Sequence, residues 1–223
     1  MQILIFIGPI LFGVLLSLII KPKPKIVYNL AVSYISLAVL LSINLWTLYF
    51  AGNKNATVTN ILLFIMNRGG ILEHLVLGYL TGNIAINNRI SKIIRSTLWG
   101  ISILTGSMFI GATIGKLQHL TEMTSFFTTS GYAIWFLYFI MTAETLGGLG
   151  ILLHFNLKTG PLATAGLIII MLGAVYTHWH NNDPFSDSYA AVGQLINLTL
   201  MLILYYFEKQ ANRKLPATVI YVI

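Results

Sequence analysis

Apolar residues occur along this chain in seven long runs that short polar segments separate. The runs cover residues 3–20, 26–50, 59–82, 97–115, 131–153, 161–178 and 190–207. A helix rises about 1.5 Å per residue, so about 20 apolar residues cross the roughly 30 Å hydrocarbon core of a bilayer. The pattern therefore predicts an all-α fold, a polytopic transmembrane helix bundle with about seven spans, embedded in a lipid bilayer.

Composition supports a membrane protein. Of the 223 residues, 57% are hydrophobic and 9% are charged, and the mean hydropathy is +0.82, which leaves too little polar surface for a soluble globule. The formal net charge is +7, but the basic residues are divided among short loops, so we expect no nucleic-acid partner. The absence of cysteine excludes disulfides and thiolate metal sites.

The basic residues divide unequally between the two sets of alternating loops. One side carries Lys21, Lys23, Lys25, Arg89, Lys92, Arg95, Lys158, Lys209, Arg213 and Lys214. The other side carries only Lys54 and Lys116. Basic loops stay in the cytoplasm. We therefore expect a bacterial-type inner membrane, an outside N-terminus and a cytoplasmic C-terminus. The first run lacks a basic start and a small-residue cleavage site, so we expect it to be retained as a span.

The third apolar run is interrupted by polar residues. Asn67-Arg68-Gly69-Gly70 precedes Ile71-Leu72-Glu73-His74, a pattern that favours a broken helix, with a continuous or re-entrant segment as the alternatives. Charged groups at bilayer depth need a partner or a polar cavity. We therefore expect Arg68 to lie inside the bundle and to be neutralised by Glu73 or Glu144.

A series of short motifs occurs in order in the second half of the chain. They are GATIGKL at 111–117, AETLGGLG at 143–150, KTGP at 158–161, MLGAVYTH at 171–178 and Asp183-Pro184. Their order and spacing resemble the DoxX family of four-helix membrane proteins, although the family's Thr-Arg turn has no arginine here. The resemblance implies a DoxX-like four-helix region at 96–207, after an N-terminal three-span region at 1–95 and before a cytoplasmic tail at 208–223.

The resemblance also implies a class of function. DoxX-like proteins are linked to membrane redox systems, including thiosulfate:quinone oxidoreductase and assemblies with detoxifying enzymes. It implies a subunit or accessory of a quinone-linked redox system, with a membrane redox-protein partner and a lipophilic small molecule, such as a quinone, between the helices. The alternatives are a non-catalytic scaffold or assembly subunit of a larger complex, and a small-molecule or proton carrier.

Glu144 is the first candidate catalytic residue, because it falls near the bilayer midplane, where a carboxylate is a functional candidate. Ala143, Gly147 and Gly150 form a small-residue seam for helix packing, and Glu144 projects about 100° away from it. The carboxyl group is therefore suited to donating a hydrogen bond or a proton to a quinone carbonyl. The alternative is a protonated or Arg68-paired glutamate that only packs.

Glu73 is the second candidate catalytic residue, and Arg68 and His74 are candidate ligand-binding residues beside it. Glu73 and Glu144 fall at a similar depth in spans that run in the same direction, so we expect them to converge. Such a cluster could bind a polar head group, relay a proton or hold a quinone carbonyl. The alternative is a charge-neutralised structural network.

Lys116 and His178 are candidate ligand-binding residues at the outer face, where His119, His180 and Asp183 could complete a rim. Lys116 as a snorkelling side chain is the alternative. His178 and His180 cannot share a helical face, and the spacing specifies no third ligand, so we expect no metal site. His74 and His178 differ in depth, which disfavours haem. The chain has no P-loop, Rossmann fingerprint, nucleophile elbow or HExxH motif.

Overall fold

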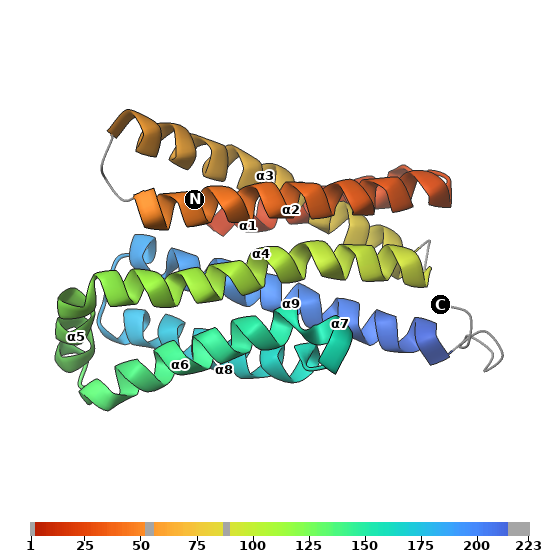
Figure 1. Ribbon diagram of the computed structural model, residues 1–223. Coiled ribbons are helices and arrows are strands. Elements are labelled where there is room, and N and C mark those ends of the chain that lie inside the picture. The colour runs from red at the N-terminus through yellow and green to blue at the C-terminus, as the bar shows by residue number, and fades with distance from the viewer. Residues whose placement is uncertain (1–2, 52–55, 87–89, 214–223) are drawn as a thin grey trace.

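The computed structural model describes residues 3–51, 56–86 and 90–213, and every regular element in these ranges is an α-helix (Figure 1). The helices are α1 (Ile3–Ile19), α2 (Pro24–Ala51), α3 (Ala56–Ile86), α4 (Ser91–Gln118), α5 (Leu120–Thr129), α6 (Ile134–Leu152), α7 (His154–Leu157), α8 (Gly160–His180) and α9 (Phe185–Arg213). The predicted all-α, polytopic class is confirmed.

Six of the seven predicted spans are helices that are long and apolar enough to cross a membrane, namely α2, α3, α4, α6, α8 and α9. The first predicted span is an apolar but shorter helix, α1, whose 17 residues extend about 25 Å. It packs along α3, with Gly78 against Ile10 and Gly82 against Ser17. From Ile10 to Ser17 along α1, the contacting residue of α3 changes from Gly78 to Gly82, so α1 and α3 run in the same direction.

Four helices in the second half of the chain form a ring. α4 packs on α6, α6 on α8, α8 on α9, and α9 again on α4. On the outer side of this ring α2 lies along α4, and α3 and α1 lie beyond it (Figure 1). The DoxX-like part of the sequence therefore forms a four-helix bundle, and the N-terminal helices form a layer against one of its faces.

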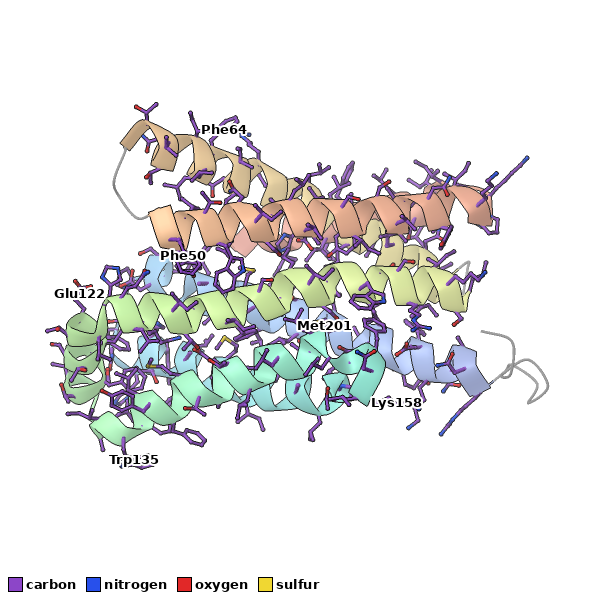
Figure 2. The ribbon with its side chains drawn as sticks, in the orientation of Figure 1. Phe50, Phe64, Glu122, Trp135, Lys158 and Met201 are labelled. Atoms are coloured by element: carbon purple, nitrogen blue, oxygen red, sulfur yellow. The ribbon has the colours of Figure 1, made fainter. Side chains whose placement is uncertain are left out.

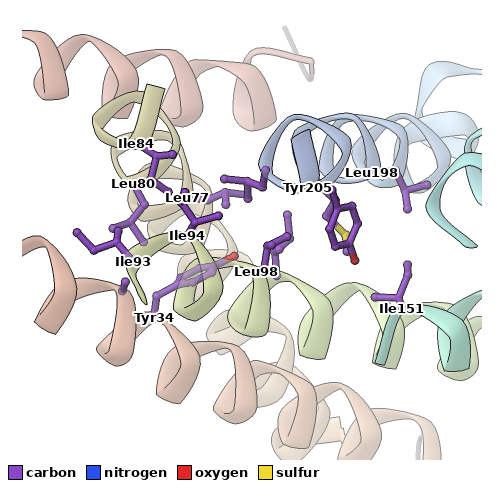
Figure 3. Close-up of a cluster of buried hydrophobic side chains, with 14 of the residues drawn as sticks. Tyr34, Leu77, Leu80, Ile84, Ile93, Ile94, Leu98, Ile151, Leu198 and Tyr205 are labelled. Carbon is purple, nitrogen blue, oxygen red and sulfur yellow. The ribbon is translucent and has the colours of Figure 1, made fainter. Parts of the chain in front are cut away.

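One hydrophobic core connects the bundle with the N-terminal layer. Tyr34 from α2 and Leu80 from α3 meet Leu98 from α4, and the same cluster continues to Leu198 on α9 and Ile151 on α6 (Figure 3). A second, smaller cluster joins α2 to α4. The three N-terminal helices are therefore packed into the molecule and are not a separate unit.

α3 continues as a helix through Asn67 and Gly70, so of the broken, continuous and re-entrant alternatives the continuous helix is the one observed. The physical reason is packing: a Cβ atom on Gly69 would meet the Leu41 side chain 2.5 Å away. The glycine lets α2 approach α3 closely, while the backbone keeps its helical hydrogen bonds.

Several helix boundaries differ from the apolar runs. α4 begins at Ser91, before the predicted start at 97, and α9 continues to Arg213, so the first part of the predicted tail is helical and 214–223 lies outside the described residues. The polar connection after α4 contains an additional helix, α5, which lies across the end of the bundle (Figure 1). Its Phe126 ring packs on His178 with centroids 5.4 Å apart.

The basic residues gather at one end of the molecule. Those at helix ends on the α7 side are Lys21, Lys23, Lys25, Lys92, Arg95, Lys158, Lys209 and Arg213. Figure 2 shows Lys158 at this end and Glu122 at the opposite end, where Lys116 lies near the end of α4. Lys54, Arg89 and Lys214 lie outside the described residues. The described residues of the predicted basic loops therefore lie at one end of the molecule.

Candidate functional site

Lys116 and Glu144 form an ion pair between α4 and α6. Lys116 Nζ lies 2.5 Å from Glu144 Oε2, and the Glu144 side chain is almost completely buried. Lys116 is close to the end of α4, and α6 starts at the same end of the bundle, so the long lysine side chain reaches inward to the middle of α6. The partner of Glu144 is therefore Lys116 and not Arg68.

An aromatic side chain from the N-terminal layer lies beside this pair. The Tyr49 ring packs against α4, where Cβ atoms on Gly111 and Gly115 would lie 2.6 and 3.1 Å from it. Gln118 Nε2 donates a hydrogen bond to the Tyr49 carbonyl oxygen at 3.2 Å. The glycines of the GATIGKL motif therefore admit a ring from α2 to the place where the ion pair sits.

The neighbouring turns of α6 are held closely on both sides. Gly147 and Gly150 face α8, where added Cβ atoms would meet Leu167 and Ala163, so the predicted packing role of these two glycines is confirmed. Gly148 faces α4, against the backbone of Gly106. The frame around Glu144 is therefore rigid.

Lys116 is the more accessible member of the ion pair. The Lys116 side chain is 21% exposed, whereas the Glu144 side chain is 4% exposed. Elsewhere on α2, the helix that carries Tyr49, the side chains of Ile43, Trp46, Thr47 and Phe50 form a shallow, open apolar surface. The arrangement combines a reachable ammonium donor, a buried carboxylate and nearby apolar surface, which suits a lipophilic molecule that carries a hydrogen-bond acceptor.

Glu73 belongs to a different cluster. Tyr34 donates a hydrogen bond of 2.5 Å to Glu73 Oε1, and His74 Nδ1 lies 2.9 Å from Oε2. His74 Nδ1 also lies 2.7 Å from the carbonyl oxygen of Gly70. Glu73 is fully buried where α2 packs on α3, and α3 and α6 are not packed against each other in the described chain. The expected convergence of Glu73 with Glu144 is therefore wrong.

Arg68 faces the outside of α3 and not the bundle interior. Its guanidinium lies 5.6 Å from the centroid of the Phe64 ring, and none of the ion pairs among the described residues includes it. The expected neutralisation of Arg68 by Glu73 or Glu144 is wrong. Residues i and i−4 share a helical face, so Phe64 directs the long side chain towards the start of α3, the direction of snorkelling.

The outer-face candidates do not form one site. His178 Nδ1 lies 2.8 Å from Asp183 Oδ2 within the turn between α8 and α9, and His119 lies 3.4 Å from Glu122 on the surface. His180 stacks on Tyr176 instead. The predicted rim therefore separates into local pairs. Among the described residues, no group of three or more His, Asp or Glu side chains could hold a metal ion.

The sequence analysis missed a second buried pair, His154 with Glu208, at the opposite end of the bundle. His154 Nε2 lies 3.1 Å from Glu208 Oε2, and Nδ1 accepts a hydrogen bond of 3.2 Å from the Gly160 N–H. Since Nδ1 accepts, Nε2 carries the proton and donates to Glu208. The Tyr205 ring packs on His154 with centroids 4.5 Å apart. Polar residues recur at intervals of about one or two turns along α9, and this spacing was the sequence signal that could have indicated the site.

A row of buried polar groups lies between the two ends of the bundle. Their unsatisfied atoms are Ser102 Oγ and Thr105 Oγ1 on α4, Thr164 Oγ1 on α8, and Gln194 Oε1, Asn197 Oδ1 and Tyr205 OH on α9. None of these atoms has a hydrogen bond of good geometry to another described residue, although the Tyr205 hydroxyl lies close to those of Ser102 and Thr164. A buried polar group without a hydrogen-bond partner lowers the stability of the fold by about 1–3 kcal/mol, so the row indicates that the bundle interior has a role besides helix packing.

One region of the chain is similar to a known protein family. Residues 100–205 match the model of the DoxX-like family. The match begins in α4 and ends in α9, so it contains the bundle together with Lys116, Glu144 and His154, and it confirms the resemblance expected for 96–207. No curated protein and no solved structure matches the chain.

Proposed function

We propose that this DoxX-like multi-pass membrane protein is a subunit or accessory of a quinone-linked redox system, and that it holds a quinone beside the Lys116–Glu144 pair. The observation that carries the proposal is the pair itself, an ammonium and a carboxylate 2.5 Å apart within membrane-spanning helices. Replacing a buried ion pair by apolar residues is often neutral or stabilising, so a purely structural bundle does not require it.

The chemistry of the pair suits a quinone carbonyl. An ammonium group has three N–H donors, of which one points to Glu144, and its partial exposure leaves a donor for a ligand oxygen. Two-electron reduction of a quinone also consumes two protons. Glu144 is the proton-exchanging group closest to that ammonium, and a membrane redox-protein partner would supply the electrons. Tyr49 and the apolar surface of α2 would contact the apolar part of the molecule.

We further propose a bacterial-type inner membrane, with the N-terminus outside and the C-terminus in the cytoplasm. Two observations support this orientation. The described basic residues gather at the α7 end of the bundle, which is the cytoplasmic end by the positive-inside rule. In addition, α1 runs in the same direction as α3 with α2 between them, which supports α1 as a crossing of its own and hence seven crossings with the six longer helices.

The test is mass spectrometry of the lipid-soluble molecules that purify with the protein. Wild type should retain a quinone in stoichiometric amount. Glu144→Gln weakens the charge-assisted contacts at the site and should reduce retention about tenfold or more. The matched control is Glu122→Gln, because Glu122 is an exposed carboxylate at the same end of the molecule. Equal retention by wild type and Glu144→Gln, or no quinone in wild type, would contradict the proposal.

A further inference from the structure

We propose that the interior of the four-helix bundle conducts protons along the buried polar row from Gln194 to Glu208. The row comprises Gln194, Asn197, Tyr205 and Glu208 on α9, Ser102 and Thr105 on α4, and Thr164 on α8. This activity goes beyond the ligand site and does not require a quinone.

The row follows one face of α9 through most of the bilayer. Steps of three, eight and three residues separate its four members on α9, and each step returns to nearly the same helical face. From Gln194 to Glu208 the helix rises about 21 Å, compared with about 30 Å of hydrocarbon. The row is therefore long enough to connect the inner aqueous side with the outer part of the bundle.

α4 supplies the facing groups in matching order. Gln194 Nε2 donates to the sulfur of Met108 at 3.0 Å, and the Tyr205 hydroxyl points towards Ser102 and Thr164. Since α4 and α9 run in opposite directions, Thr105 falls between these two levels. Polar groups thus occur on both helices at each level.

The hydroxyl groups of the row are not engaged by their own helices. Thr97 and Thr177, by contrast, donate to the carbonyl oxygen one turn earlier, at 2.9 Å in each case. Such back-bonding is how membrane helices usually satisfy a threonine. Ser102, Thr105 and Thr164 lack it, so their oxygens are available both to accept and to donate hydrogen bonds to bridging water molecules.

Tyr205 connects the row with the inner end. A Cβ atom on Gly160 would overlap the Tyr205 hydroxyl, so only glycine leaves room for this group beside His154. Glu208 lies on the same face of α9 one turn further, and its side chain is 18% exposed. Glu208 is therefore the group of the row that exchanges protons with the inner aqueous phase.

The transfer consists of successive proton hops. A proton binds the Glu208 carboxylate, and each hydroxyl or bridging water then accepts one proton and releases another until one leaves beyond Gln194. No electrons move, and each group returns to its starting state. His154 is a positioning residue, because its Nε2–H bond to Glu208 fixes the carboxylate. The middle of the row carries no charged side chain, so it offers hydrogen bonds to a hopping proton but no counter-ion to a hydrated metal ion.

The test is proton flux into liposomes that contain the purified full-length protein, driven by a potassium diffusion potential and followed with a trapped pH-sensitive dye. Wild type should acidify the interior faster than protein-free liposomes. Thr105→Val and Tyr205→Phe each remove one hydroxyl at nearly constant volume, and each should reduce the flux about tenfold. Thr97→Val, the matched control on α4, should retain wild-type flux because its hydroxyl is engaged within the helix.

Thermal unfolding of the same variants separates conduction from packing. Thr105→Val removes a hydroxyl that has no partner among the described residues, so its melting temperature should be unchanged or higher, and Tyr205→Phe, whose hydroxyl makes no hydrogen bond of good geometry, should change the melting temperature little. Reduced flux with unchanged stability supports the proposal. Wild-type flux equal to that of protein-free liposomes, or wild-type flux in both variants, overturns it. If one variant fails to insert, the other decides the result. Quinone retention is measured separately, so failure of either proposal is distinguishable from failure of the other.

Discussion

At the scale of single residues, the Lys116–Glu144 pair combines a strong attraction with a large loss of hydration. Both groups lie in or beside the low-dielectric bundle, where an unpaired charge is far more costly than in water. Each side chain therefore stabilises the protein mainly by neutralising the charge of the other. This mutual dependence can be measured by removing one or both partners.

Lys116→Met should destabilise the protein by about 3–5 kcal/mol, because it leaves the Glu144 carboxylate buried without a partner. The double variant Lys116→Met with Glu144→Met should recover most of this loss. Unfolding in mixed micelles measures both effects. Lys92→Met is the control, since Lys92 is exposed near the other end of α4. A single variant no less stable than this control would mean that the pair contributes nothing.

The residue scale also shows what the sequence could and could not predict about the site. Glu144 and Lys116 were candidates because intramembrane charge is rare, and depth along a helix follows from counting residues. Their pairing was not predicted, and Arg68 was wrongly placed inside. The direction in which a side chain points depends on which helices are neighbours, and apolar periodicity does not specify neighbours when lipid and protein are both apolar.

At the scale of elements, glycine contacts determine how the short helix α1 is held. Lipid is as apolar as the helix surface, so close packing must replace the hydrophobic effect as the reason for association. Gly78 brings α3 against the backbone of Ile10, and Gly13 brings α1 against the backbone near Leu75. At each of these contacts a glycine of one helix lies against the backbone of the other.

Gly78→Ala should destabilise the protein by about 1–3 kcal/mol, since the new Cβ atom would overlap the Ile10 carbonyl oxygen. Gly70→Ala on the same helix is the matched control, because a Cβ there meets open space. It should be neutral or stabilising, by about 0.5–1 kcal/mol from helix propensity. The measurement is unfolding of the two variants in detergent. An equal response to both substitutions would show that this contact does not hold α1.

The elements differ in how well the apolar pattern predicted them. The six long helices followed directly from run length. α5 was missed because it is too short to cross a membrane and its apolar residues pack across the bundle end, as the contact of Phe126 with His178 shows. For α3 the broken, continuous and re-entrant alternatives were open, and Gly69 serves close packing with Leu41. From the sequence alone, a glycine that breaks a helix cannot be distinguished from a glycine that lets two helices pack closely.

At the scale of the whole molecule, the N-terminal layer completes the candidate site. The family match covers 100–205, yet Tyr49 and the apolar surface come from α2. α2 packs along α4, one helix of the bundle, and the core is continuous across this boundary. The bundle that contains the DoxX-like match therefore shares its candidate site with a helix outside the matched region.

The proposed orientation predicts the outcome of reporter fusions. A reporter that is active only in the cytoplasm should be active after Ile223, because the basic end of the bundle stays inside. An alkaline phosphatase inserted near Glu122 on α5 should be active outside. Phosphatase activity after Ile223 would show an even number of crossings or the opposite orientation.

The most direct test of the ligand site is photoaffinity labelling of the membrane-embedded protein with an azido-quinone, followed by peptide mapping. Label should appear in α2 between Ile43 and Phe50 and in the turns around Lys116 and Glu144. Excess unmodified quinone should compete it away, and Glu144→Gln should lose most of it. Label spread evenly over the lipid-facing helices, and unaffected by competitor or by Glu144→Gln, would contradict a quinone site beside the Lys116–Glu144 pair.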